Sequence, residues 1–410
     1  MGAVRSTLVA ATGMTAAQGL SLMIHSRILQ PAEVGRYAWV LATMGSIAVV
    51  TALGIPRAII QAPDLSFSQF RVLRRQTGLL ALCLMLVGPV VILLLDRSID
   101  GSAIVLALAI AGSSAMGLVT SVCVAWLQRH LQHGVVARRQ LYGYVASYLV
   151  LGSCLAWLGF GVWSLVISNV FQSVLVLIQF AMLTSAPRRA PLKTAHIPMR
   201  LRRFGLQAVV LQFAEGVTTT IVLISATSLM GLSTTGALSR SLLITQLTLG
   251  TFFNIYLTVS SSSFARLQSD FPAVRSLCKK ICGFHVPAVI ALGSIVGLIG
   301  PSLIPTIMGE AWGESADLLS LLVIITAIHF LSSPFYIAIE ALGSIGPKLA
   351  IQMGFVVLLL AGVIIVRPST AERLLGMWLL VELLRTSIGL LVFSLITRDG
   401  RKQTQPQNLL

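Results

Sequence analysis

Charged side chains that stand inside long apolar segments are the residues of this sequence whose types could do chemistry. Arg57 and Glu215 are of this kind. An ionised group within a membrane is costly unless it meets a partner or water, so both residues indicate a water-lined cavity. There Arg57 could hold an anion, and Glu215 could bind a proton or Na⁺ with the Thr218 hydroxyl on the same helical face. A fixed interhelical ion pair of Glu215 with Arg57 or Arg240 is the structural alternative.

Polar residues also share helical faces, at steps of three to four residues or at longer steps bridged by apolar positions such as Val50, Ile244 and Leu247. The sets are Gln18, Ser21 and His25, with Arg27 roughly opposite; Arg36, Trp39, Thr43, Ser46, Gly54, Arg57 and Gln61; Gln207, Glu215, Thr218 and Ser225; and Arg240, Thr251, Asn254, Thr258 and Ser261. Two interpretations stay open for them, namely interhelical hydrogen bonds and the lining of a hydrated cavity. Arg27 and Arg36 stand near helix ends, where long cationic side chains can reach the interface.

We interpret three further ionisable residues as having structural roles. His329 stands alone among apolar neighbours, which is more typical of hydrogen-bonded packing than of a proton relay. Glu382 and Arg385 are spaced so that they can pair with each other on one helical face.

The composition shows which elements must position these residues. Hydrophobic residues make up 56% of the 410 residues and charged residues only 10%, against about 25% charged residues in soluble domains. The apolar blocks reach the roughly 20 residues that cross a bilayer, and they lack the alternating pattern of a barrel. Because lipid offers no partner to backbone groups, these blocks must be helices. The expected spans are 7–29, 36–61, 76–95, 103–127, 141–158, 162–183, 205–229, 236–262, 283–308, 315–339, 349–366 and 373–396.

The fold class is therefore an all-α polytopic membrane protein of about 12 transmembrane helices. The longest connection, 184–204, is strongly basic and proline-containing, and it divides the chain into two halves. The sequence predicts an N-terminal six-helix bundle (1–183), a cytoplasmic linker (184–204), a C-terminal six-helix bundle (205–396) and a cytoplasmic tail (397–410). Two such bundles around a central cavity are the plan of many transporters.

Several functional classes are disfavoured. The net charge of +16 is scattered between apolar blocks rather than gathered on one soluble surface, so no nucleic acid is expected as a partner. The five cysteines form neither a disulfide framework nor a zinc motif, and no cofactor or metal is expected. A Ser-His-Asp set and a phosphate-cradling glycine loop are also missing from the sequence, so we expect no enzyme.

Several segments together resemble a known family. The first hairpin reads SRILQPAEVGRYAWV and carries Arg27, Leu29, Pro31, Gly35 and Tyr37 in the pattern Arg-x-Leu-x-Pro-x-x-x-Gly-x-Tyr. The segments that follow in the expected order are LGIPRAIIQ, DLSFSQF, MGLSTTGALSRS, FARLQSD and IMGEAWGESADLL. In these segments the chain resembles the Wzx-type polysaccharide flippases of the multidrug/oligosaccharidyl-lipid/polysaccharide exporter superfamily.

The resemblance implies that the protein flips an undecaprenyl-pyrophosphate-linked oligosaccharide across the bacterial inner membrane by alternating access. This step serves exopolysaccharide, capsule or O-antigen (lipopolysaccharide) synthesis, with membrane lipids, a polymerase and chain-length proteins as further partners. A sugar and pyrophosphate headgroup needs hydroxyls and arginines around it. The expected substrate contacts are Arg57, Arg240, Arg27, Arg36, Asn254, Gln18 and His25, and the expected ion-coupling residues are Glu215 and Thr218.

Two alternatives remain. A cation-coupled multidrug antiporter of the same superfamily would favour carboxylates in the cavity, whereas Arg57 and Arg240 against the central Glu215 favour an anionic substrate. A membrane polysaccharide polymerase or ligase would carry a large outer loop with catalytic basic residues, and the expected outer loops are short.

The distribution of basic residues predicts the topology. Most of the 29 lysines and arginines fall at the termini or in alternate connections, while the remaining connections hold only Arg97 and Arg367. Since cytoplasmic loops retain positive charge, both termini should be cytoplasmic. With Lys193→Cys and Glu310→Cys made singly in a cysteine-free background, an impermeant thiol reagent applied to intact cells should label only position 310. Labelling of position 193 from outside would contradict this orientation.

Overall fold

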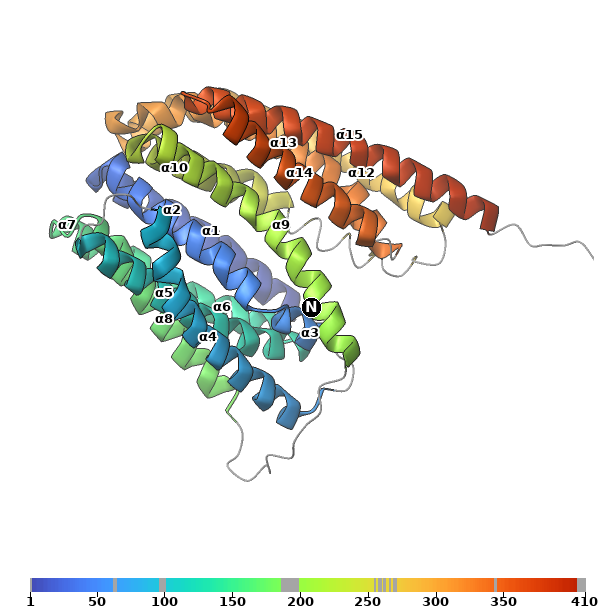
Figure 1. Cartoon of the computed structure of the whole chain (residues 1–410). Coiled ribbons are helices and arrows are strands. Elements are labelled where there is room, and N and C mark those ends of the chain that lie inside the picture. The colour runs from blue at the N-terminus through green and yellow to red at the C-terminus, as the bar shows by residue number, and fades with distance from the viewer. Residues whose placement is uncertain are drawn as a thin grey trace, which may run out of the picture. The chain divides into compact units, whose positions relative to one another are not determined.

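The computed structural model describes residues 2–61, 65–95, 101–185, 199–253, 271–342 and 345–403, together with Tyr256, Ser260, Ser263, Phe264 and Leu267. These residues are almost entirely helical, and no strand occurs among them (Figure 1). Nine helical segments in this part of the chain are long and apolar enough to cross a membrane. The predicted all-α membrane fold is confirmed.

The predicted spans are helical over nearly all their described residues. This includes the spans 7–29, 141–158 and 236–262, which are not among the nine segments. The chain separates into two compact units, Met1–Thr227 and Ser228–Leu410. This division falls within the seventh expected span. Residues 186–198 of the predicted linker lie outside the described residues, and the division into two six-helix bundles at 184–204 stays a prediction.

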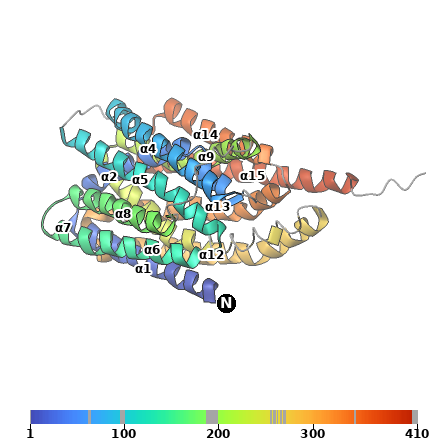
Figure 2. The same ribbon diagram turned by 90° about the horizontal axis from the view of Figure 1, so that it is seen from below.

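The first unit is a bundle of helices (Figures 1 and 2). Its elements are α1 (Gly2–Ile28), α2 (Pro31–Thr51), α3 (Ile55–Gln61), α4 (Phe67–Leu95), α5 (Gly101–Arg129), α6 (His133–Tyr144), the π-helical segment η1 (Val145–Gly152), α7 (Ser153–Trp157), α8 (Val162–Leu183) and most of α9 (Met199–Leu229). In this unit α5 packs against α2, α3, α4 and α8, and α1 packs against α6 and η1.

The second expected helix is interrupted, which corrects the prediction of one span over 36–61. Helix α2 ends at Thr51, and the backbone then turns through Leu53 (φ 47°) and Gly54 (φ 65°) before α3 begins at Ile55. Pro56 lacks a backbone N–H and fits the first turn of a helix but not its interior. The Gly54-Ile55-Pro56 sequence therefore ends one helix and starts another, and the predicted polar stripe does not continue unbroken to Arg57.

Close helix packing in the first unit depends on small residues. Gly152, at the end of η1, lies where α1 and α8 meet it: a Cβ atom at this position would stand 2.5 Å from Ser168 Oγ and 3.0 Å from His25 Nε2. Without a side chain the three helices can approach closely, as small residues allow in membrane bundles.

The second unit also consists of helices. Its elements are α10 (Leu232–Thr245), the π-helical segment η2 (Gln246–Gly250), α12 (Phe271–Met308), the 3₁₀ turn η3 (Glu310–Trp312), α13 (Gly313–Ala341), α14 (Ile345–Val366) and α15 (Ala371–Gln403). Helix α13 packs against α10, α12, α14 and α15, and it is the centre of this unit. A buried cluster that includes Phe264, Val274, Ile339 and Phe393 joins α12, α13 and α15 near one end.

The packing at Gly152 gives a test of the first unit. Gly152→Val should lower the melting temperature of the solubilised protein, because overpacking a well-filled contact costs about 1–3 kcal/mol. Gly19→Val on α1 is the matched control, since a Cβ atom there would meet nothing within 4 Å. Thermal unfolding followed by fluorescence checks both variants. Equal melting temperatures would show that α1, η1 and α8 do not pack this closely.

Candidate functional site

The interrupted second span places Arg57 on the short helix α3. The Ile55 N–H donates to Ala52 O at 3.0 Å, and the Ala58 N–H donates to Gly54 O at 3.0 Å, so the turn is closed by backbone hydrogen bonds. Broken helices at membrane depth are tolerated only where protein or a water-filled cavity surrounds them, and transporters use such breaks at their binding sites. The break therefore supports Arg57 as a candidate binding residue.

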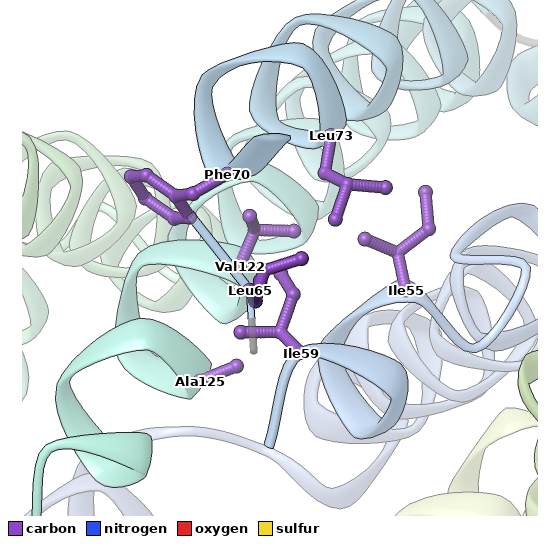
Figure 3. Close-up of a cluster of buried hydrophobic side chains, with 7 residues drawn as sticks. All are labelled: Ile55, Ile59, Leu65, Phe70, Leu73, Val122 and Ala125. Atoms are coloured by element: carbon purple, nitrogen blue, oxygen red, sulfur yellow. The ribbon is translucent and has the colours of Figure 1, made fainter. Parts of the chain in front are cut away.

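An apolar cluster fixes α3 against the rest of the first unit. Ile55 and Ile59 point from α3 toward Phe70 and Leu73 of α4 and Val122 of α5 (Figure 3). All five side chains are buried. Helix α3 is thus held by the side chains on either side of Arg57 in the sequence.

A polar contact adds to this anchor. Arg129, the last residue of α5, donates from Nη1 to the backbone oxygen of Ile59 at 3.2 Å. Carbonyl groups in the last turn of a helix have no partner within the helix, so this contact satisfies one of them. Helix α3 is therefore held at its end as well as along its apolar face.

Arg57 itself is half-buried. Among the residues that the structure describes, its guanidinium forms neither a hydrogen bond nor an ion pair. A guanidinium presents five N–H donors in a planar fork that matches phosphate oxygens. On an anchored helix, such a group can bind an anion without first breaking an ion pair.

The other predicted residues of the first hairpin have different surroundings. Arg36 of α2 donates from Nη2 to Ser102 Oγ at the start of α5, at 3.0 Å. Arg27, one residue before the end of α1, is exposed. The structure therefore ties Arg36 to a neighbouring helix. The roles of both residues toward substrate stay predictions.

His25 and Gln18 of α1 are not equivalent. His25 is 1% exposed, and its Nδ1 lies 2.7 Å from Ser21 O and 3.1 Å from Ser21 Oγ. Its Nε2 faces Gly152, so the imidazole lies within the packing of α1, η1 and α8. Gln18 is half-buried. This burial supports a packing role for His25, whereas its role as a substrate contact stays a prediction.

Interhelical hydrogen bonds account for part of the polar stripes. Ser46 of α2 and Thr220 of α9 share a hydroxyl–hydroxyl hydrogen bond of 2.7 Å, and Thr220 Oγ1 also donates to Ala42 O at 3.1 Å. Thr43 donates to Trp39 O within its own helix at 2.8 Å. These hydroxyls support helix packing, which is the first of the two interpretations left open by the sequence.

Glu215 and Thr218 of α9 lie in different environments. Glu215 is exposed, whereas Thr218 is 5% exposed and its buried Oγ1 has no hydrogen-bond partner among the described residues. The ion-coupling role of the pair stays a prediction.

Arg240 of α10 is buried in the second unit. Its guanidinium lies over the ring of Trp312, 5.6 Å from the centroid, and Trp312 is fully buried. This contact joins the second half of α10 to the Gly-x-x-Trp turn before α13. Ser241 Oγ adds to it by donating to Ser315 O at 2.8 Å. Arg240 thus fixes one end of the unit. Asn254, also predicted to bind substrate, lies outside the described residues.

A buried ionic network lies in the middle of the second unit. Arg385 of α15 donates from Nε to Glu382 Oε1 at 3.0 Å and makes a second, shorter contact from Nη2 to the same oxygen. The two residues are 5% and 2% exposed. Their predicted pairing is present. The structure adds His329 of α13, whose Nδ1 lies 3.0 Å from Arg385 Nη2 and 3.4 Å from Glu382 Oε1.

The remaining polar groups of the network come from α13 and α14. Arg385 Nη2 donates to Ser332 Oγ of α13 at 3.1 Å, and Arg385 Nη1 donates to Gln352 Oε1 of α14 at 3.5 Å. Tyr336 donates its hydroxyl to Arg385 O at 2.7 Å, and its ring lies 4.8 Å from the guanidinium carbon. The network therefore joins α13, α14 and α15, and it neutralises the buried charges within the protein.

The sequence indicated only part of this network. The spacing of Glu382 and Arg385 predicts their pairing, but it says nothing about partners on other helices. His329 and Ser332 are spaced to share a face of α13, and Gln352 is a polar residue within an apolar helix. These were the available signals, and only the tertiary structure shows that they converge.

Comparison with known proteins places the chain in a family. Residues 24–317, which form most of the chain, match the family described as polysaccharide biosynthesis protein. Among curated proteins none matches the sequence.

Solved structures show what fold this sequence adopts. An inward-facing multidrug resistance MATE family transporter of the MOP superfamily matches with a TM-score of 0.74 and 16% identity, over 98% of this chain and 99% of that chain. The lipid II flippase MurJ, in an inward closed conformation, matches with a TM-score of 0.73 and 12% identity, over 94% and 87%. A MOP superfamily transporter from Pyrococcus furiosus matches with a TM-score of 0.68 and 14% identity, over 97% and 96%. The chain thus belongs to the polysaccharide biosynthesis protein family, and it has the fold of the MOP superfamily transporters.

Proposed function

We propose that the protein flips an undecaprenyl-pyrophosphate-linked oligosaccharide from the inner to the outer leaflet of the bacterial inner membrane. The flipped oligosaccharide would be used in exopolysaccharide, capsule or O-antigen synthesis, with polymerase and chain-length proteins as further partners. Membership of the polysaccharide biosynthesis family supports this substrate class. Its fold is shared with a flippase of another lipid-linked substrate, lipid II, and with multidrug transporters.

The arrangement of Arg57 is the observation that carries the proposal. A pyrophosphate-linked headgroup is anionic, and it needs cationic donors that are not already held by carboxylates. Arg57 is half-buried on an anchored helix directly after a break in a membrane-spanning segment, and it forms no ion pair within the described chain. We infer that it lines the transport pathway and holds the pyrophosphate or an acidic sugar.

Multidrug export is the second candidate, and the similarity to a MATE transporter favours it. A site for cationic drugs would be expected to present carboxylates. The two carboxylates placed deep in the predicted spans are Glu215 and Glu382, and Glu382 is already paired with Arg385. Arg57, which forms no ion pair within the described chain, is the feature that favours an anionic substrate.

Arg57→Ala should abolish polymer export while the amount of protein in the membrane stays normal, because the substrate loses its phosphate partner. Arg57→Lys should restore export only partly, since an ammonium keeps the charge but lacks the planar fork. Arg75→Ala is a matched control, because Arg75 is an exposed arginine of α4 in the same unit. Cell-surface polymer and membrane protein are measured in the same cells. Full export by Arg57→Ala would refute the assigned role.

The substrate class is decided with purified protein. Proteoliposomes that contain the wild type should flip a polyprenyl-pyrophosphate-linked oligosaccharide carrying a fluorophore and should not expel a cationic dye. The opposite result would identify a multidrug transporter.

We also propose that Glu215 couples transport to an ion gradient. Glu215→Gln imitates the protonated carboxyl and should remove the dependence of flipping on the gradient in proteoliposomes. If Glu215 instead formed a fixed latch with an arginine, neutralising that arginine should rescue the Gln variant, so Glu215→Gln combined with Arg57→Gln or Arg240→Gln separates the two roles. Unchanged gradient dependence in Glu215→Gln alone would rule out coupling through this residue.

A further inference from the structure

The network of Glu382, Arg385 and His329 contains one atom that cannot satisfy both of its neighbours at once. His329 Nδ1 lies 3.0 Å from Arg385 Nη2, which is a hydrogen-bond donor, and 3.4 Å from Glu382 Oε1, which is an acceptor. A neutral Nδ1 without hydrogen accepts from Arg385, whereas a protonated Nδ1 can only donate. The contacts around His329 therefore depend on whether this atom carries a proton.

With neutral histidine, the proton of the imidazole is on Nε2 and Arg385 Nη2 donates to Nδ1. The charges of Glu382 and Arg385 then cancel, and the network is neutral as a whole. This suits its position near the middle of α13 and α15, where net charge is costly. It is the state that fits the 3.0 Å contact best.

When a proton binds to Nδ1, an N–H bond forms there and the hydrogen bond from Arg385 is lost. The new N–H faces Glu382 Oε1, and Arg385 keeps its contacts to Glu382, Ser332 and Gln352. The net charge of the network changes from zero to +1. A network with that charge is more stable where water reaches it, so protonation favours a conformation of the unit in which the site is hydrated.

His329 is the exposed member of the network. Its side chain is 52% exposed, whereas that of Glu382 is 2% exposed. Ser332 helps to hold the guanidinium, because its hydroxyl accepts from Arg385 and donates to the backbone oxygen of His329 at 2.8 Å. An exposed base thus contacts a buried ion pair.

The other ionisable groups around α13 are held elsewhere. From α12, His285 is buried with Nε2 2.7 Å from Phe330 O. From α10, Arg240 stacks on Trp312 at the far end of α13. From α14, Lys348 pairs with Glu340 at 2.8 Å. On α13 itself, Tyr336 donates to Arg385 O.

This leaves Glu382 and Arg385 as the charged side chains in contact with His329 within the described chain.

We propose that His329 is the proton-binding site through which the second unit responds to a pH gradient, with Arg385 as the group that it releases on protonation. The inference rests on the proposed transport function and names the coupling ion as H⁺. It differs from coupling at Glu215, because it lies in the other unit and depends on a histidine beside an ion pair.

The first test is direct and needs no substrate. The full-length protein, with its six histidines labelled with ¹⁵N, is placed in lipid nanodiscs and titrated by NMR between about pH 5 and pH 8. The signal that is lost in His329→Gln is the signal of His329. We expect Nδ1 to be without hydrogen at high pH and protonated at low pH. A hydrogen on Nδ1 at high pH, or no change over this range, would overturn the proposal.

The second test measures transport. Proteoliposomes under a pH gradient without a membrane potential contain a polyprenyl-pyrophosphate-linked oligosaccharide with a fluorophore. Gln at position 329 can still accept from Arg385 but cannot bind a proton, so in His329→Gln the flipping rates with and without the gradient should be equal. His130→Gln is the matched control, because His130 is an exposed histidine of the first unit, and it should keep the acceleration.

The outcomes separate the two ideas. If the wild type flips the probe and His329→Gln retains the full acceleration by the pH gradient, the proton-binding role is wrong while the proposed function stands. If the wild type does not flip the probe, the proposed function fails, and the NMR titration alone decides whether His329 binds the proton.

Discussion

The structure depends on one constraint: within lipid, each polar group must find its partner inside the protein. Most hydroxyls meet it locally, as Thr77 does by donating to Leu73 O at 2.9 Å and Ser147 by donating to Gly143 O at 2.6 Å. Where a side chain bonds to another helix, it also fixes packing, as Ser46 does with Thr220. The most demanding case is Arg385, whose charge requires partners on α13, α14 and α15.

The same constraint explains how much of the fold could be predicted from the sequence. Long apolar segments must be helices whatever their neighbours are, so hydropathy alone locates the spans. It does not locate a break, because a turn of Leu53 and Gly54 is as apolar as the helix before it. The signal was Pro56, which fits the first turn of α3 but not the interior of a longer helix.

The candidate site was less predictable, because residue type and spacing reveal a polar face but not what covers it. His25 and Arg57 both belong to predicted polar faces. His25 is 1% exposed within the packing of three helices, whereas Arg57 is half-buried. Likewise, the pairing of Glu382 with Arg385 follows from their positions on one helix, but the contact with His329 depends on how α13 packs against α15, which no local pattern contains.

Arg57 and Arg385 show how one type of side chain can serve either for packing or for binding. Arg385 is bound to Glu382, Ser332, Gln352 and His329, and removing one partner of a buried ion pair costs about 3–5 kcal/mol. An anionic substrate would have to displace Glu382 to reach it. Arg57 has its helix fixed by apolar contacts and its guanidinium without an ion pair in the described chain. Because apolar side chains fix the helix, the guanidinium is not needed for anchoring. Its N–H donors can therefore bind a phosphate of the substrate.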